Sequence, residues 1–242
     1  MMTSIKWIAC LSIMVSGAHA WAQSSGPIAE PPPRAAWYTY ERHCADCHGK
    51  LGDGRGPSGK RFLVHATDFT SGVYKCRSTA SGSAPTDNDL RRSIGEGIHG
   101  TAMPDFRAVG SLQIDDLTQL LKSFSRKPWI ASASLEVPAE AVNDSDSVTR
   151  GGAVYNQMKC ATCHGDRGQG ASALGTLHND NGSPVVLTDF TKRRQLKCGD
   201  TPSRLYLTLM TGLDGTPMAS YAEALTPADA WDLVHYLASL QN

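Results

Sequence analysis

Two copies of one short motif constrain this chain more than any other feature. Each copy has two cysteines separated by two residues and a histidine directly after the second: Cys44, Cys47 and His48, then Cys160, Cys163 and His164. This spacing is typical of c-type haem attachment, in which both thiols bond the vinyl groups of one haem and the histidine becomes the proximal ligand of its iron. We therefore expect two covalently bound haems c, one at each motif.

A thioredoxin-like redox pair and half of a zinc site are the alternative interpretations of each cysteine pair. Neither explains why a histidine follows directly in both copies, and a zinc site would need further ligands at short spacing. A glycine also follows each histidine, at Gly49 and Gly165. The sequence therefore favours haem over a redox dithiol or zinc.

The motifs belong to a longer internal repeat. Landmarks recur in the same order, between 115 and 122 residues later: Thr67-Asp68-Phe69-Thr70 as Thr188-Asp189-Phe190-Thr191, Lys75-Cys76 as Lys197-Cys198, and 100–104 as 215–219. Matched order at a nearly constant offset indicates a duplicated module. We expect a first domain over 23–126, a second over 150–242, and a proline-containing linker over 127–149 between them.

Residues 1–22 are typical of an export signal. Lys6 precedes a short apolar stretch, 7–15, and small residues near position 20 offer a cleavage site. The stretch is too short to span a bilayer, and no later segment approaches the required length. Lys plus Arg and Asp plus Glu both total 23, which favours neither nucleic acid nor an anionic membrane surface as a partner. We expect a soluble protein exported to the periplasm, with no membrane insertion after signal cleavage.

Helical patterns predict the ends of each module. Residues 35–45 and 151–161 run as helices into the first cysteine of each motif, and apolar residues over 117–124 recur at helical spacing. Thr226 and Pro227 are typical of a helix start, and an apolar stripe follows from Trp231. Frequent glycine and proline between these helices predict loops and short turns, so we expect a mainly α fold.

On these motifs the sequence resembles the tandem diheme class I cytochromes c, over nearly all of the chain after the export signal. The resemblance implies two tandem class I cytochrome c domains, each with one covalently bound haem. In that family a methionine in a Gly-Thr-x-Met-Pro-like loop is the sixth iron ligand. Carried over to this sequence, Met103 pairs with His48 and Met218 with His164. The second loop departs slightly from the pattern, with Pro217 before the methionine and alanine after it.

Other residues compete for the sixth position. Four histidines outside the motifs have no histidine at the equivalent position of the other module: His65, His99, His178 and His235. Met103 and Met218, in contrast, occupy equivalent positions in the two modules. Core packing is the alternative role for the two methionines. Cys76 and Cys198 occupy equivalent positions and leave three interpretations open: a disulfide between the modules, two buried thiols, or a thiolate iron ligand.

Iron held by histidine and methionine has both axial positions filled and a raised potential. These properties suit one-electron transfer, so we predict an electron carrier rather than an enzyme, with redox proteins as donor and acceptor. One alternative is a diheme oxidoreductase of the thiosulfate dehydrogenase or cytochrome c peroxidase kind, with a labile or cysteine-ligated haem. Another is a subunit of a larger respiratory complex with an obligate partner.

Overall fold

Helices joined by loops make up the fold. The computed structural model describes residues 31–130, 132–170, 177–192 and 196–241, and within these ranges no strand is present. The β pairing described there is an isolated bridge between His178 and Pro184. The prediction of a mainly α fold is confirmed. The predicted export signal, 1–22, lies outside the described residues.

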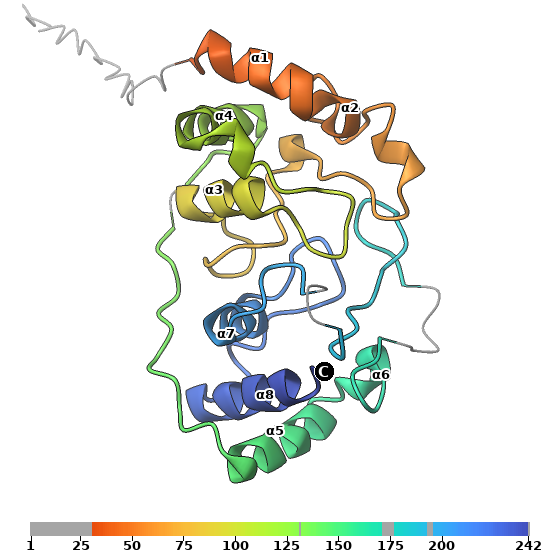
Figure 1. Ribbon diagram of the computed structural model, residues 1–242, viewed down its shortest axis with the longest axis vertical. Helices are drawn as coiled ribbons and strands as arrows, with labels where there is room; N and C mark the ends of the chain where they lie inside the picture. Colours follow the sequence, from red (N-terminus) through yellow and green to blue (C-terminus); the bar gives the residue numbers. More distant parts are fainter. Residues whose placement is uncertain (1–30, 131, 171–176, 193–195, 242) are drawn as a thin grey trace, which may run out of the picture. The chain divides into compact units, whose positions relative to one another are not determined.

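The first module contains four α-helices and three short 3₁₀ helices within the described residues (Figure 1): α1 (Arg34–His43), α2 (Ala45–His48), η1 (Gly59–Arg61), η2 (Phe69–Ser71), α3 (Asp87–Glu96), η3 (Arg107–Val109) and α4 (Ser111–Phe124). Helix α4 packs against both α1 and α3. Their apolar faces meet in one core that includes Tyr40, Leu90 and Leu120. This core holds the first cysteine motif at the end of α1.

The second module contains α5 (Ser145–Gln157), α6 (Ala161–His164), α7 (Pro202–Thr211) and α8 (Pro227–Ser239). Helix α8 packs against α5 and α7 around a separate core (Figure 1). Gly151 explains how α5 and α8 approach so closely, because a Cβ at this position would lie 2.0 Å from the carbonyl oxygen of Asp232. A glycine inside a helix costs about 1 kcal/mol relative to alanine, and here it permits the helix crossing.

The structure differs from the sequence prediction in two respects. Helix α5 begins at Ser145, several residues earlier than predicted, because the Asp144 side chain accepts a hydrogen bond from the backbone N–H of Ser147 at 2.8 Å. Helices α3 and α7 also occupy segments that we expected to form loops and turns. Thr86 caps the start of α3 in a capping box with Asp89, and Pro202 occupies the first turn of α7.

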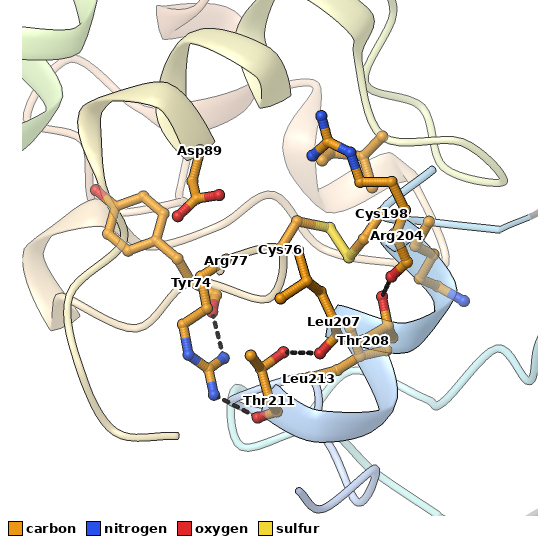
Figure 2. Close-up of a disulfide and its surroundings, with 12 residues drawn as sticks. Tyr74, Cys76, Arg77, Asp89, Cys198, Arg204, Leu207, Thr208, Thr211 and Leu213 are labelled. Atoms are coloured by element: carbon orange, nitrogen blue, oxygen red, sulfur yellow. Dashed lines mark hydrogen bonds between the residues drawn. A yellow bond between two sulfur atoms is a disulfide. The ribbon is translucent and has the colours of Figure 1, made fainter. Parts of the chain in front are cut away.

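A disulfide between Cys76 and Cys198 joins the two modules, with Cα atoms 5.2 Å apart (Figure 2). Of the three interpretations of these cysteines, the disulfide is therefore confirmed. Close by, the buried guanidinium of Arg77 donates to the Thr211 carbonyl oxygen at 2.6 Å and to Asp214 Oδ1 at 2.7 Å. Both modules fall within one compact unit, Pro32–Asn242.

Candidate functional site

Each module contains one cavity that gathers its predicted site residues. Cys44, Cys47, His48 and Met103 all line the first cavity, which encloses about 1270 Å³ when its open mouth is included. The second cavity, of about 980 Å³, is lined by the corresponding residues Cys160, Cys163, His164 and Met218. The structure thus brings together every residue that the sequence assigned to each site.

A tyrosine fixes each cysteine motif against the helix that precedes it. The buried hydroxyl of Tyr40, on α1, donates to the carbonyl oxygen of Gly49 at 2.8 Å. In the second module the Tyr155 hydroxyl donates to the Gly165 carbonyl oxygen at 2.7 Å. Both glycines end a one-turn helix with φ near +80°, a conformation that glycine adopts without strain. The motif is therefore held at both ends before any cofactor contributes.

The histidine of each motif is oriented by a backbone carbonyl. Nδ1 of His48 lies 3.1 Å from the carbonyl oxygen of Thr67, and Nδ1 of His164 lies 3.3 Å from that of Thr188. A proton on Nδ1 leaves the lone pair on Nε2, as in histidines that ligate metals. Burial lowers the pKa of both imidazoles, although the carbonyl contact opposes the shift. Burial thus favours the neutral form, which is the form that binds a metal.

The repeated Thr-Asp-Phe-Thr segment supports these histidines, a role that sequence reasoning did not assign to it. Its first threonine supplies the accepting carbonyl, and its phenylalanine lies against the imidazole. Ring centroids of His48 and Phe69 are 4.4 Å apart, and those of His164 and Phe190 are 4.5 Å apart. The aspartate, Asp68 in the first copy, accepts from the backbone N–H of Thr70 at 2.8 Å and fixes the turn. The recurrence of four residues was the signal that could have revealed this role.

The methionines lie in loops of the same construction. In the first module, Thr101 Oγ1 donates to the Ile98 carbonyl oxygen at 2.7 Å and accepts from the Met103 N–H at 3.2 Å, while the Ile98 N–H donates to the Met103 carbonyl oxygen. The same contacts occur in the second loop among Leu213, Thr216 and Met218. The departures at Pro217 and Ala219 therefore leave the loop geometry intact.

Burial disfavours a thiolate at the first cysteine of each motif. Burial raises the pKa of Cys44 to about 11, and the neighbouring Cys47 contributes in the same direction. Burial also raises the pKa of Cys160 to about 11. Reactive and zinc-binding cysteines need a thiolate, which a lowered pKa favours. In the described part of the chain, no three His, Cys, Asp or Glu residues gather as metal ligands. The site residues fit a covalently attached haem instead.

The rival histidines differ in their surroundings. Both ring nitrogens of buried His235 are engaged, Nδ1 by Ser147 Oγ at 2.5 Å and Nε2 by Glu140 Oε1 at 3.3 Å. His99 has a buried Nδ1 with no hydrogen-bond partner among the described residues, but it lines neither cavity. His65 does line the first cavity, together with Met103. The methionine loops are shared by both modules, whereas His65 belongs to one.

Comparisons with known proteins agree with this geometry. A family model described as "Cytochrome c" matches residues 148–241, and one described as "Cytochrome C oxidase, cbb3-type, subunit III" matches residues 31–122. A solved chain of the reducing HAO-like protein complex of Kuenenia stuttgartiensis is 33% identical. The match covers 88% of this chain and 98% of that chain, with a TM-score of 0.82. The chain belongs to the tandem diheme class I cytochromes c. Two cytochrome c domains imply covalently bound haem c, consistent with two haems.

Curated relatives of this diheme cytochrome are also subunits of redox assemblies. The "Cbb3-type cytochrome c oxidase subunit CcoP" of Azospirillum sp. (strain B510) is 29% identical over 210 residues, and that of Azospirillum brasilense is 28% identical over 207. Each match covers 83% of this chain, which spans about 60% of the length of these relatives.

These relatives correct one expectation. The prediction of a soluble protein exported to the periplasm is wrong, because both curated relatives are subunits of an oxidase complex rather than free carriers. The prediction rested on the composition of residues 1–22 and on the charge balance, and neither shows whether a protein belongs to an assembly. Among the residues that the structure describes, no helix has the length and apolar character needed to cross a membrane.

Proposed function

We propose that this diheme cytochrome relays single electrons between a redox donor and a redox acceptor through two His/Met-ligated haems. One observation carries the proposal. In both modules, the motif histidine, with its Nδ1 on a backbone carbonyl, and a methionine held by a threonine line the same cavity as the two motif cysteines. This arrangement would supply two cysteine attachments and two iron ligands at each site.

The chain's own residues have separate tasks in this mechanism. The four motif cysteines would attach the haems, His48 and His164 would hold the irons through Nε2, and Met103 and Met218 would supply the second iron ligands. Bound haems would supply a one-electron iron couple. A methionine thioether would favour the ferrous state, and an iron with both protein ligands in place would have no open position for small molecules. The mainly apolar lining of each cavity would reduce contact between the haem and water.

The relatives support a role within a complex. CcoP is by name a subunit of cytochrome c oxidase, and the solved chain is part of a protein complex. We propose that this chain likewise acts as a cytochrome subunit and exchanges electrons with a protein partner. Of the alternatives, the cysteine-ligated oxidoreductase loses its proposed ligand, because Cys76 and Cys198 are bonded to each other.

Substitution of the methionines tests the ligand assignment. Met103→Leu and Met218→Leu nearly preserve volume but remove the thioether, so each should abolish the methionine charge-transfer band of one ferric haem and lower the potential of that haem. Met210→Leu is the matched control, because Met210 packs against the second core and does not line the cavity. The mass of the unsubstituted protein should include two haems. Unchanged spectra and potentials in both ligand variants would refute the assignment.

A further inference from the structure

Two lysines lie where the two cavities adjoin. Lys75 and Lys197 line the first cavity, and the same two side chains line the second. In the described part of the chain, no other charged side chain is common to both linings. Each lysine directly precedes a cysteine of the disulfide, whose Cα atoms are 5.2 Å apart. The disulfide therefore holds both lysines at the boundary between the cavities.

These lysines have no carboxylate in salt-bridge contact among the described residues. Nζ of Lys197 donates to the Val186 carbonyl oxygen at 3.0 Å and to Thr188 Oγ1 at 3.3 Å, both of which are neutral acceptors. Burial lowers the pKa of Lys75, and it lowers that of Lys197 to about 8, with the charge of Lys75 contributing. Neighbouring cations withdrawn from water are unfavourable unless an anion is paired with them.

We propose that Lys75 and Lys197 together bind carboxylate groups of both haems and so form one shared anion site between the two redox centres. This inference rests on the proposed function, because those carboxylates arrive with the attached haems. Lysine–carboxylate hydrogen bonds are charge-assisted, and they would pair two cations whose side chains are partly withdrawn from water. The equivalent positions of the lysines in the repeat give each module one half of the site.

A shared site couples the two haems electrostatically. A positive charge near an iron favours the ferrous state, so a lysine that serves both cavities raises both potentials. Besides the motif residues, other titratable groups line the two cavities: His43, His65, Tyr74, Tyr155, Lys159 and Tyr221. The charge of Asp180 raises the pKa of Lys75. A pH dependence of the potentials that comes from the lysines has to be separated from the titration of these groups.

Lysine variants of the haem-loaded full chain test the proposal. In Lys75→Met and in Lys197→Met, we expect both midpoint potentials to fall and the infrared carboxylate bands of the haems, identified by ¹³C labelling, to shift. Lys75→Arg and Lys197→Arg should restore both readouts, because the positive charge and its hydrogen bonds return. Lys159→Met is the matched control: Lys159 is exposed and lines only the second cavity, so the first haem should not respond.

The dependence on pH and on added anions separates the possible partners. Carboxylate pairing keeps Lys197 protonated, so both potentials of the unsubstituted protein should stay level as the pH passes 8. A fall of both potentials there, abolished by Lys197→Met, would show a lysine without an anion and overturn the proposal. If the potentials change when acetate replaces another anion at constant ionic strength, the lysines bind a free anion from solution, and the proposal is overturned.

Different results would refute the proposed electron relay and the shared lysine site. Fewer than two haems by mass, or no thioether band in the unsubstituted protein, would refute the His/Met electron relay itself. If both are present but the lysine variants leave the carboxylate bands unchanged, only the shared site is refuted.

Discussion

Glycines before the two methionines fix the path of their loops. Gly97 has a φ of +72°, and a Cβ there would lie 2.7 Å from the carbonyl oxygen of Met103. Gly212 has a φ of +67°, and a Cβ there would lie 2.8 Å from the carbonyl oxygen of Met218. Backbone strain and steric contact therefore exclude a side chain at both positions. The ligand loops can pass close to the preceding helix only because glycine occupies these sites.

Gly212→Ala should therefore affect the second haem as well as stability. Gly212 has φ +67° and ψ −171°, a backbone region that costs a residue other than glycine about 1–3 kcal/mol. The added methyl group would also push the Met218 backbone away. We expect a weaker thioether band and a lower potential for the second haem. Gly182→Ala is the control, because its φ is +78° but nothing lies within 4 Å of its Cβ.

Chemical denaturation and redox titration of both variants check this prediction. Both should lose stability through the backbone, but only Gly212→Ala should alter the haem. Equal spectra in the two variants would contradict the proposed role of the close approach.

The loop after the disulfide and the end of α7 form an asymmetric contact between the modules. Arg77, with no exposed side-chain surface, donates to Thr211 and Asp214 of the second module. Asp214 also accepts from Ser81 Oγ and from the Gly82 N–H, each at 2.8 Å. Because Asp214 lies four residues before Met218, the first module anchors the ligand loop of the second.

Arg77→Met removes the ion pair with Asp214 and leaves the carbonyl oxygens of Tyr74 and Thr211 without this donor. Asp214 keeps its bonds from Ser81 and Gly82, so the free energy of unfolding should fall by about 1–3 kcal/mol. Arg107→Met is the matched control, because Arg107 and Asp105 form an exposed pair at 3.6 Å with side chains 71% and 52% accessible. Such a pair contributes about 0–1 kcal/mol. Urea unfolding of the haem-loaded variants measures both values. Equal losses of stability in the two variants would contradict the role of Arg77 in joining the modules.

The sequence predicted features that depend on local motifs better than contacts between distant residues. The cysteine motifs are local and repeated, so residue type and spacing were enough to propose them, and the resemblance to class I cytochromes c added the methionines; the structure places all of them in one cavity per module. The capping signals of Asp144 and Thr86 are also local but were not recognised: Asp144 lies in a segment without a sustained apolar period, and Thr86 lies in a stretch where glycine and proline favoured loops. The Arg77–Asp214 contact joins residues 137 apart. The repeat conceals it, because Gly199 and His99 occupy the equivalent positions.

The whole molecule combines two independent ligand sets with one shared boundary. Each module has its own core, and both proposed iron ligands of each site line the cavity of one module. The modules share the disulfide, the Arg77–Asp214 pair and the two lysines. The proposed ligation thus depends on a single module, whereas the relative position of the two cavities depends on contacts between modules.

The double variant Cys76→Ser/Cys198→Ser separates these two properties. The disulfide spans 122 residues, and the chain-entropy estimate for closing such a loop is about 5 kcal/mol. We expect stability to fall by up to this amount, because the unfolded chain regains that freedom. Both thioether bands should persist, because His48 and Met103, like His164 and Met218, belong to one module each.

Urea unfolding and the ferric spectra of the double variant and of each single variant measure the two effects. If either single variant alters an iron spectrum while leaving stability unchanged, the cysteine would be acting as a ligand, and the electron-relay assignment would give way to the oxidoreductase alternative. If stability falls and both spectra are retained, the disulfide acts on the arrangement of the modules. Loss of the disulfide would then also loosen the site that Lys75 and Lys197 share between the cavities. In the double variant, Lys75→Met should therefore no longer lower both potentials together.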